Sequence, residues 1–230
     1  MPGLAMYGLI YALVGFFFRV FWNFRIVDRQ NLPPRTKRGV LVAVNHLDWT
    51  DVYVVGGTLP VSYRPTWFAK KEVFRNPLVA CFLGAMNVIP LDSGEADRHA
   101  YLAAKSALER GAAMVVFPEG HRSENHALIA GKSGAVRLAV RTGVPIVPMA
   151  VWGTEVGFFG AMLRKPIRAR YGEPYYPSVD ISKMRDGWDR LTEDLMLRIA
   201  ALLPAQYRGI YGEGAPRAEY ATQPAVTSPT

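Results

Sequence analysis

Charge-poor runs of four to ten residues recur along the chain, separated by longer segments in which apolar side chains follow a helical period. Runs of this length, flanked by Gly, Pro and polar residues, predict buried strands. The expected strands are residues 39–44, 66–70, 87–91, 112–118, 144–153 and 167–174. The expected helices are residues 49–59, 74–86, 97–111, 133–143 and 185–204. Strands that alternate with helices predict an α/β fold, here a single domain with a largely parallel mixed sheet flanked by helices.

Several expected helix ends carry the residues that helix termini prefer. Thr50 or Asp48 stands where the first expected helix begins, and both residue types cap helix N-termini. Pro77 opens the second helix, because its fixed φ suits the first helical position. Gly143 closes the helix at 133–143. These signals support the division of the chain into alternating strands and helices.

Residues 4–24 form a strongly apolar segment with one charged residue, Arg19. Its uncharged part, residues 4–18, is shorter than the roughly 20 residues of a spanning helix. We expect a helix embedded in one leaflet of a membrane, with Trp22 and Arg25 near the headgroups. A buried core helix is the alternative. The positive charge beyond the segment favours the cytoplasmic face of the cell membrane for the rest of the chain.

Composition changes near both ends of the chain and indicates three parts. Residues 1–25 are expected to form the membrane-associated helix, and residues 26–211 the α/β domain. After Gly212 the chain is dominated by Gly, Pro, Ala and Thr, so residues 212–230 are expected to be a flexible tail.

The net charge of +8 indicates an anionic partner. The basic residues fall in short clusters at 35–38, 69–75 and 164–170, and none of these is a long basic tail. No nucleic-acid-binding signature is present, so nucleic acid is not an expected partner. The charge therefore favours a phospholipid surface or a phosphorylated substrate.

The single cysteine, Cys81, excludes an internal disulfide framework. It lies in the apolar stretch LVACFLG, which predicts a buried and unreactive thiol rather than a nucleophile.

His46 and Asp51 follow an apolar run in the stretch VNHLDWTD, which spans residues 44–51. Five residues correspond to about 140° on a regular helix, so the two side chains would not meet there. They can meet where a strand turns into a helix. A carboxylate that accepts from one imidazole nitrogen fixes the tautomer and leaves the other nitrogen free to take a proton. The stretch is therefore either a polar loop or a general base with its orienting carboxylate.

A second polar stretch, VVFPEGHRSE at residues 115–124, leaves another expected strand. Ligands of open α/β sheets bind beyond the carboxyl ends of the strands, so both stretches can reach one crevice. Arg122 lies beside a glycine turn and suits bidentate phosphate recognition, although a structural ion pair is its alternative role.

Together these residues resemble the PlsC-like glycerolipid acyltransferases, the group of the lysophosphatidic acid acyltransferases. NHLDWTD matches the NHx4D motif of that family, and FPEGHRS matches its FPEGTRS motif with His121 in place of Thr. FAKKEVF resembles its lysine-bearing block and VPIVPMAV its fourth block, so the resemblance runs from Gly39 to Trp152. The second block reads NVIPLDSG, with Ser93 where the family commonly has Arg.

The resemblance implies an enzyme that moves a fatty acyl group from acyl-CoA or acyl-carrier protein to the free hydroxyl of lysophosphatidic acid, which gives phosphatidic acid. His46 would deprotonate the hydroxyl and Asp51 would orient the imidazole. Residues 147–151 would line or support the site. The residues that would bind the acceptor or shape its pocket are Lys70, Lys71, Glu119, Gly120, Arg122 and Ser123. The resemblance implies neither a cofactor nor a metal ion.

The sequence supports competing functions less well. A serine hydrolase would need a G-x-S-x-G turn, which is absent. The four histidines form no HExxH or Cys/His cluster, so a metal enzyme is not indicated, and His121 and His126 are expected to be polar loop residues. A non-catalytic membrane binder would have no need of a base at His46. An acyltransferase with another acceptor, such as glycerol 3-phosphate, another lysophospholipid or a glycolipid, is the closest alternative, because Ser93 replaces the usual Arg.

Overall fold

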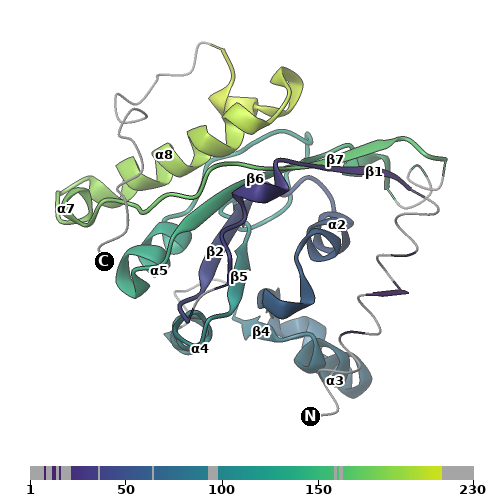
Figure 1. Ribbon diagram of the computed structural model, residues 1–230, viewed down its shortest axis with the longest axis horizontal. Helices are drawn as coiled ribbons and strands as arrows, with labels where there is room; N and C mark the ends of the chain where they lie inside the picture. Colours follow the sequence, from purple (N-terminus) through teal and green to yellow (C-terminus); the bar gives the residue numbers. More distant parts are fainter. Residues whose placement is uncertain are drawn as a thin grey trace.

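The computed structural model describes residues 22–213, except 36, 64, 93–97, 158–159 and 161–162, together with residues 8, 12, 13 and 16. Figure 1 shows a central sheet with helices on both sides. The strands of this sheet are β1 (Asn23–Val27), β2 (Val40–Val44), β5 (Ala113–Val116), β6 (Ile146–Trp152) and β7 (Pro166–Tyr171), in the order β1-β7-β6-β2-β5. The strands β3 (Trp67–Lys70) and β4 (Val88–Leu91) form a second, two-stranded sheet.

The sheets are largely parallel, as the alternation of strands and helices predicts. β2 is parallel to both β5 and β6, β1 is parallel to β7, and β3 is parallel to β4. The exception is the antiparallel pair of β6 and β7. An isolated parallel bridge between Thr66 and Met114 places β3 beside β5. The carboxyl ends of β2, β5, β6 and β3 therefore face the same edge, where ligands of such sheets bind.

The helices lie on both sides of the five-stranded sheet (Figure 1). The α-helices are α2 (Asp51–Thr58), α3 (Pro77–Ala85), α4 (Arg98–Glu109), α5 (Gly134–Thr142), α7 (Val179–Ser182) and α8 (Gly187–Leu202). Short 3-10 segments are η1 (Arg29–Asn31), η2 (Val61–Tyr63), η3 (Lys71–Arg75), η4 (Thr154–Val156), η5 (Ala205–Tyr207) and η6 (Gly209–Tyr211). Thr50 is the N-cap residue of α2, and α5 ends at Gly143, whose left-handed φ of 64° is easy for glycine.

Side chains of the central strands alternate between two hydrophobic clusters. Leu41 and Ala43 of β2 pack into the cluster that contains α4, α5 and α8. Val42 and Val44 pack into the other cluster, with α2 and Trp67. Successive side chains of a strand point to opposite faces, so covering both faces buries every residue of β2. This is why β2 is a continuous apolar run in the sequence.

The N-terminal segment differs in part from its prediction. Residues 23–25 belong to β1, which pairs with β7, rather than to a helix. Trp22 is 3% exposed and packs in the cluster with α2, so the prediction that it lies near lipid headgroups is wrong. Most of the apolar segment, and with it the predicted membrane helix, lies outside the described residues. No helix among the described residues is both long enough and apolar enough to cross a membrane. The predicted tail from residue 214 onward also lies outside them.

Cys81 is exposed, so the prediction of a buried thiol is wrong. It lies on α3, a helix of apolar residues that packs beside β4 and η3 but has no buried residue. An apolar sequence does not distinguish a core helix from one whose apolar side chains face outward.

Candidate active site

The turn from β2 into α2 brings His46 and Asp51 together. β2 ends at Val44, His46 lies on the turn, and Asp51 is the first residue of α2. His46 Nδ1 lies 2.9 Å from Asp51 Oδ2, so the geometry predicted for this pair is present. The imidazole is 14% exposed, whereas the carboxylate is fully buried. The remaining ring nitrogen, Nε2, is the one available to an incoming hydroxyl.

Three nitrogen atoms surround the same oxygen of Asp51. In addition to His46 Nδ1, the backbone N–H groups of Leu47 and Asp48 donate to Oδ2, at 2.6 and 2.8 Å. A carboxylate only accepts hydrogen bonds, so Nδ1 carries the imidazole proton in this arrangement. Nε2 is then the basic nitrogen. The turn thus holds the carboxylate rigidly and sets the tautomer that a general base requires.

Asn45 and Thr50 hold the turn from either side. The side-chain amide of Asn45 donates to the backbone O of Val151 and accepts from its N–H, both at 2.8 Å, and it is completely buried. Thr50 Oγ1 donates to Asp48 Oδ1 at 2.9 Å and contacts the backbone O of Thr154 at 3.3 Å. Val151 lies in β6 and Thr154 follows it, so these contacts fix the His46–Asp51 pair, here called the dyad, to the sheet. The role of Asn45 was not predicted from the sequence, although a polar residue directly after a buried strand is a usable signal.

Phe117 and Glu119, from the loop after β5, lie against His46. The Phe117 ring stacks on the imidazole, with centroids 4.0 Å apart and planes inclined by 22°. Glu119 Oε1 accepts from the backbone N–H of His46 at 3.2 Å. The ends of β2 and β5 are thereby joined at the dyad. The stacked ring also limits rotation of the imidazole, which keeps Nδ1 toward Asp51.

Glu119 is 1% exposed, and its Oε2 is buried without a hydrogen-bond partner among the described residues. Burial raises the pKa of Glu119 to about 8; the N–H of His46 lowers it and the charge of Asp51 raises it. Glu119 is therefore mostly neutral at neutral pH. The site holds one protonated carboxyl group beside the carboxylate that pairs with His46.

Gly120 turns the loop with φ of 79°, a value that residues other than glycine rarely adopt. A Cβ at this position would also stand 2.9 Å from Lys132 Nζ, so the ammonium group lies against the turn. The backbone N–H of Lys132 donates to the O of Pro118 at 2.8 Å, which fixes this approach. Lys132 is an exposed cation beside Gly120, and no motif in the sequence indicates it.

The backbone of Ser123 connects its loop to His46, and its hydroxyl group bonds to other residues of the same loop. Its N–H donates to the O of His46 at 2.9 Å. Its Oγ donates to Asn125 Oδ1 at 2.7 Å and accepts from the N–H of Ala127 at 3.2 Å. The residue is 3% exposed. These contacts give Ser123 a structural role in the loop, and its predicted substrate contact stays a prediction.

The predicted phosphate-binding cations lie at the same edge of the sheet but do not touch the dyad. Lys70 ends β3 and is exposed. Lys71 forms an exposed ion pair with Asp92 at 3.2 Å. Arg122 is exposed and follows the loop residues that contact His46, and His121 Nδ1 lies 3.0 Å from its backbone O. These cations are accessible to an anion in solvent, and their predicted binding role stays a prediction.

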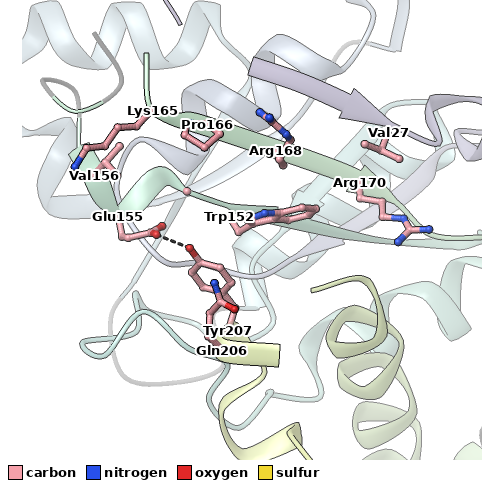
Figure 2. A pocket seen from close by; sticks show the side chains of 11 residues that line it. Val27, Trp152, Glu155, Val156, Lys165, Pro166, Arg168, Arg170, Gln206 and Tyr207 are labelled. Carbon is pink, nitrogen blue, oxygen red and sulfur yellow. Dashed lines mark hydrogen bonds between the residues drawn. The ribbon is translucent and has the colours of Figure 1, made fainter. Parts of the chain in front are cut away.

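A separate hollow of about 620 Å³ lies beyond the end of β6, and Figure 2 shows the side chains that line it. Glu155 and Tyr207 are two of the lining residues, and a hydrogen bond joins them. Its cations are Lys165, Arg168 and Arg170, and Arg170 is paired with Asp28 at 2.8 Å. None of the predicted site residues lines this hollow.

Among the described residues, no group of three or more His, Cys, Asp or Glu side chains could hold a metal ion. His126 Nδ1 instead lies 3.2 Å from the backbone O of Leu47, which places this histidine on the loop beside the dyad.

Curated relatives of this chain are 1-acyl-sn-glycerol-3-phosphate acyltransferases. The enzyme of that name from Bacillus subtilis is 31% identical over 134 residues, which cover 58% of this chain and 64% of the relative. A chloroplastic enzyme of that name from Brassica napus is 31% identical over 165 residues, covering 69% of this chain and 46% of the relative. The chain therefore spans less than two thirds of the length of these two relatives.

The fold also has a solved counterpart. The crystal structure of the 1-acyl-sn-glycerophosphate (LPA) acyltransferase PlsC from Thermotoga maritima matches with a TM-score of 0.64 at 22% identity, and covers 85% of this chain and 79% of that one. At this identity the match supports the fold. The sequence profile described as Acyltransferase matches residues 23–152, more than half of the chain, and this range includes both the His46–Asp51 turn and the Glu119 loop. The chain therefore belongs to the acyltransferase family.

Proposed function

We propose that this protein transfers a fatty acyl group from a thioester, acyl-CoA or acyl-carrier protein, to the free hydroxyl of lysophosphatidic acid. The product would be phosphatidic acid, a precursor of phospholipids. The observation that carries the proposal is the contact of His46 Nδ1 with the buried carboxylate of Asp51, which leaves Nε2 as a base. The names of the curated relatives support the acceptor.

The reaction follows from the tautomer of His46. Nε2 takes the proton of the acceptor hydroxyl as its oxygen attacks the thioester carbonyl, and Asp51 stabilises the imidazolium that forms. The tetrahedral intermediate then collapses with loss of the thiolate, which takes the proton back from Nε2. One ester bond forms and one thioester bond breaks, so no covalent enzyme intermediate is required.

The exposed cations around the dyad support a phosphate-bearing acceptor. Lys70, Lys71 and Arg122 would bind the phosphate, and Lys132 joins this group because its ammonium lies against Gly120. Arg122 offers a planar fork for two phosphate oxygens, whereas a lysine offers a point charge. Glu119 and Gly120 would shape the pocket through the loop turn.

Another acceptor is the second candidate. Asp92 pairs with Lys71, which engages one of the cations proposed for the phosphate. Ser93 follows where the family commonly has Arg. The alternative acceptors are glycerol 3-phosphate, a different lysophospholipid or a glycolipid, and weaker binding of the phosphate would favour the glycolipid in particular.

The protein would work at the cytoplasmic face of the cell membrane, where its lipid acceptor lies. The apolar segment at residues 4–24 supports this proposal, with Leu13 and Phe16 exposed among its few described residues. Exposed apolar side chains of this kind insert readily at a bilayer surface.

The test is a product analysis with purified full-length protein. Acyl-CoA and acyl-carrier protein are supplied in turn, each with lysophosphatidic acid, glycerol 3-phosphate, other lysophospholipids and a glycolipid. Phosphatidic acid as the main product supports the proposal, and its absence with the His46→Ala protein assigns the product to this site. Rapid acylation of a different acceptor would replace lysophosphatidic acid, and release of free fatty acid alone would contradict acyl transfer.

A further inference from the structure

α3 is an apolar helix in which no residue is buried within the part of the chain that the structure describes. Its residues, PLVACFLGA, include no charged side chain and no side-chain amide or hydroxyl, yet none of them is buried. Leu78, Cys81 and Phe82 share one face at helical spacing. Leu78 is 80% exposed and Phe82 46% exposed, and the thiol of Cys81 is exposed with them. Solvent-facing apolar side chains on one helix mark an interaction surface rather than a core element.

The helix is well formed despite this exposure. The side chain of Asn76 accepts from the N–H groups of Leu78 and Val79, at 2.9 and 3.3 Å, and Pro77 occupies the first turn. At the other end the N–H of Met86 donates back into the last turn. The backbone polar groups at both ends are thus partly satisfied, which a helix in contact with lipid requires.

In the sequence, charged residues directly flank only the N-terminal end of the apolar helix. The segment η3, just before it, carries Lys71 and Arg75 together with Glu72, and Lys70 precedes these. Lys71 is also paired with Asp92, so the border keeps a net positive charge. Val73, also in η3, is 48% exposed and continues the apolar surface. A basic border beside apolar side chains matches an anionic bilayer, in which the cations meet phosphate groups and the apolar side chains reach the acyl boundary.

We propose that α3 and η3 form a lipid-contacting surface that lies on an anionic phospholipid bilayer. Leu78, Cys81 and Phe82 enter the acyl boundary, and Lys71 and Arg75 lie among the headgroups. The inference rests on the proposed function and deepens it, because it assigns the surface by which the enzyme meets its lipid acceptor. Lys70 ends β3 directly before η3, so the surface adjoins the edge of the sheet that carries the dyad.

The single cysteine gives a direct probe of this surface. Cys81 of the full-length protein is labelled with an environment-sensitive fluorophore, with no other thiol in the chain. On addition of mixed phosphatidylglycerol and phosphatidylcholine vesicles, the emission should shift to the blue. Lipids that carry a quencher about 5–10 Å below the headgroups should quench it. Phosphatidylcholine alone should give a smaller shift, and high salt should reduce the shift.

Two controls test the position of the contact. The label is moved to α7 in a Cys81→Ser, Val179→Cys protein, because Val179 is 52% exposed and α7 lies at the opposite end of the molecule from α3 in Figure 1. This label should not respond to vesicles. Leu78→Asp should reduce the response of the Cys81 label at least about tenfold. Leu163→Asp removes a leucine of nearly equal exposure, 77%, and should leave the response unchanged.

Two results would overturn the inference. In the first, the protein sediments with vesicles while the Cys81 label does not respond, so that another surface makes the contact. In the second, the label is already shielded without lipid, so that a second copy or another segment covers α3. Acyl transfer to a short-chain, water-dispersed acceptor is measured on the same samples. Retained transfer in either case leaves the proposed function standing while the lipid surface is rejected.

Discussion

The carboxyl group of Glu119 accepts a hydrogen bond from the backbone N–H of His46 at 3.2 Å, and this contact joins the ends of β2 and β5 at the dyad. The two residues come from motifs 73 positions apart in the chain. The contact fixes the backbone of the proposed base, while Asp51 fixes its ring. One buried carboxyl group thus acts on the main chain of His46 and the other on its side chain.

The raised pKa of Glu119 predicts how its contribution to stability varies with pH. The unfolded chain ionises Glu119 near its ordinary value of 4.5, whereas the folded chain keeps it protonated up to about 8. Between these values the unfolded state binds fewer protons, so Glu119 lowers the free energy of unfolding as pH rises. Glu119→Gln keeps an acceptor for His46 and cannot ionise. In urea unfolding across this pH range, the free energy of unfolding of the variant should rise relative to that of the wild type, by at most about 1.4 kcal/mol per pH unit. Parallel curves would mean that Glu119 is already ionised in the folded protein.

Replacing the proposed base should abolish acyl transfer without unfolding the protein. His46→Ala should reduce kcat by about 10²–10⁴-fold, the usual contribution of a general base. Thermal unfolding of the variant provides the control, since His46 is partly exposed at its ring and its backbone contacts to Glu119 and Ser123 remain. Near-normal turnover by the folded variant would exclude the mechanism.

Asp51→Asn tests the charge of the carboxylate rather than the presence of the base. An amide oxygen in the position of Oδ2 can still accept from Leu47, Asp48 and His46 Nδ1, so the turn is preserved better than with Asp51→Ala. It carries no negative charge, so the imidazolium that forms during acyl transfer loses the partner that stabilises it. We expect a loss of kcat of up to about 10⁴-fold with a small change in acceptor KM. A loss confined to KM would show that Asp51 serves acceptor binding instead.

The acceptor site is tested by comparing two KM values. Arg122→Ala and Lys70→Ala should raise the KM of lysophosphatidic acid more than that of the acyl donor. Arg122→Lys should recover part of the loss, because lysine lacks the planar fork. Arg141→Ala, a change to an exposed arginine in the last turn of α5, should alter neither KM. An effect confined to the donor KM would reassign these cations to the donor's phosphate groups.

Asn45 provides a prediction on stability. Both of its hydrogen bonds to Val151 are buried, so Asn45→Leu leaves two backbone groups without partners. Each should cost about 1–3 kcal/mol in the free energy of unfolding, measured by urea denaturation. Asn31→Leu is the matched control, since it removes one partly buried bond to the O of Tyr171 and should cost less. Equal losses in the free energy of unfolding would mean that the hydrogen bonds of Asn45 between β2 and β6 stabilise the protein no more than the partly buried bond of Asn31.

The order of strands and helices could be predicted from the sequence, because burial imposes a regular spacing on the apolar residues. β2, with both faces covered, is a continuous apolar run, and α5 ends at the predicted Gly143. β1 could not be read, because NFRIV is short, partly exposed and continuous with an apolar segment. The exposure of Cys81 was also missed, because the sequence of α3 is apolar and only the fold leaves it uncovered.

Some contacts of the candidate site could likewise be predicted from the sequence, and others could not. The pairing of His46 with Asp51 could be predicted, because five residues across a strand–helix turn leave little freedom. The contacts of Glu119, Asn45 and Lys132 depend on how β2, β5 and β6 lie side by side, and local spacing contains no such information. The backbone contact of Ser123 to His46 belongs to the same class, whereas its hydroxyl contacts are local to the loop.

Removing residues 1–21 tests the proposed membrane attachment of the N-terminal segment. The deletion should end before Trp22, because Trp22 is buried and β1 begins at Asn23, so the α/β domain keeps its edge strand. The full-length protein should sediment with membranes and resist extraction by high salt, since burial of apolar side chains does not depend on salt. The shortened protein should bind more weakly and become extractable by salt, with α3 and its basic border as the remaining contact. Its activity should fall more with a bilayer-embedded acceptor than with a short-chain, water-dispersed one, because the His46–Asp51 turn is intact. Circular dichroism separates this outcome from the core-helix alternative, in which the shortened protein misfolds and loses both activities together. A folded, shortened protein with unchanged, salt-resistant binding would place the attachment outside residues 1–21.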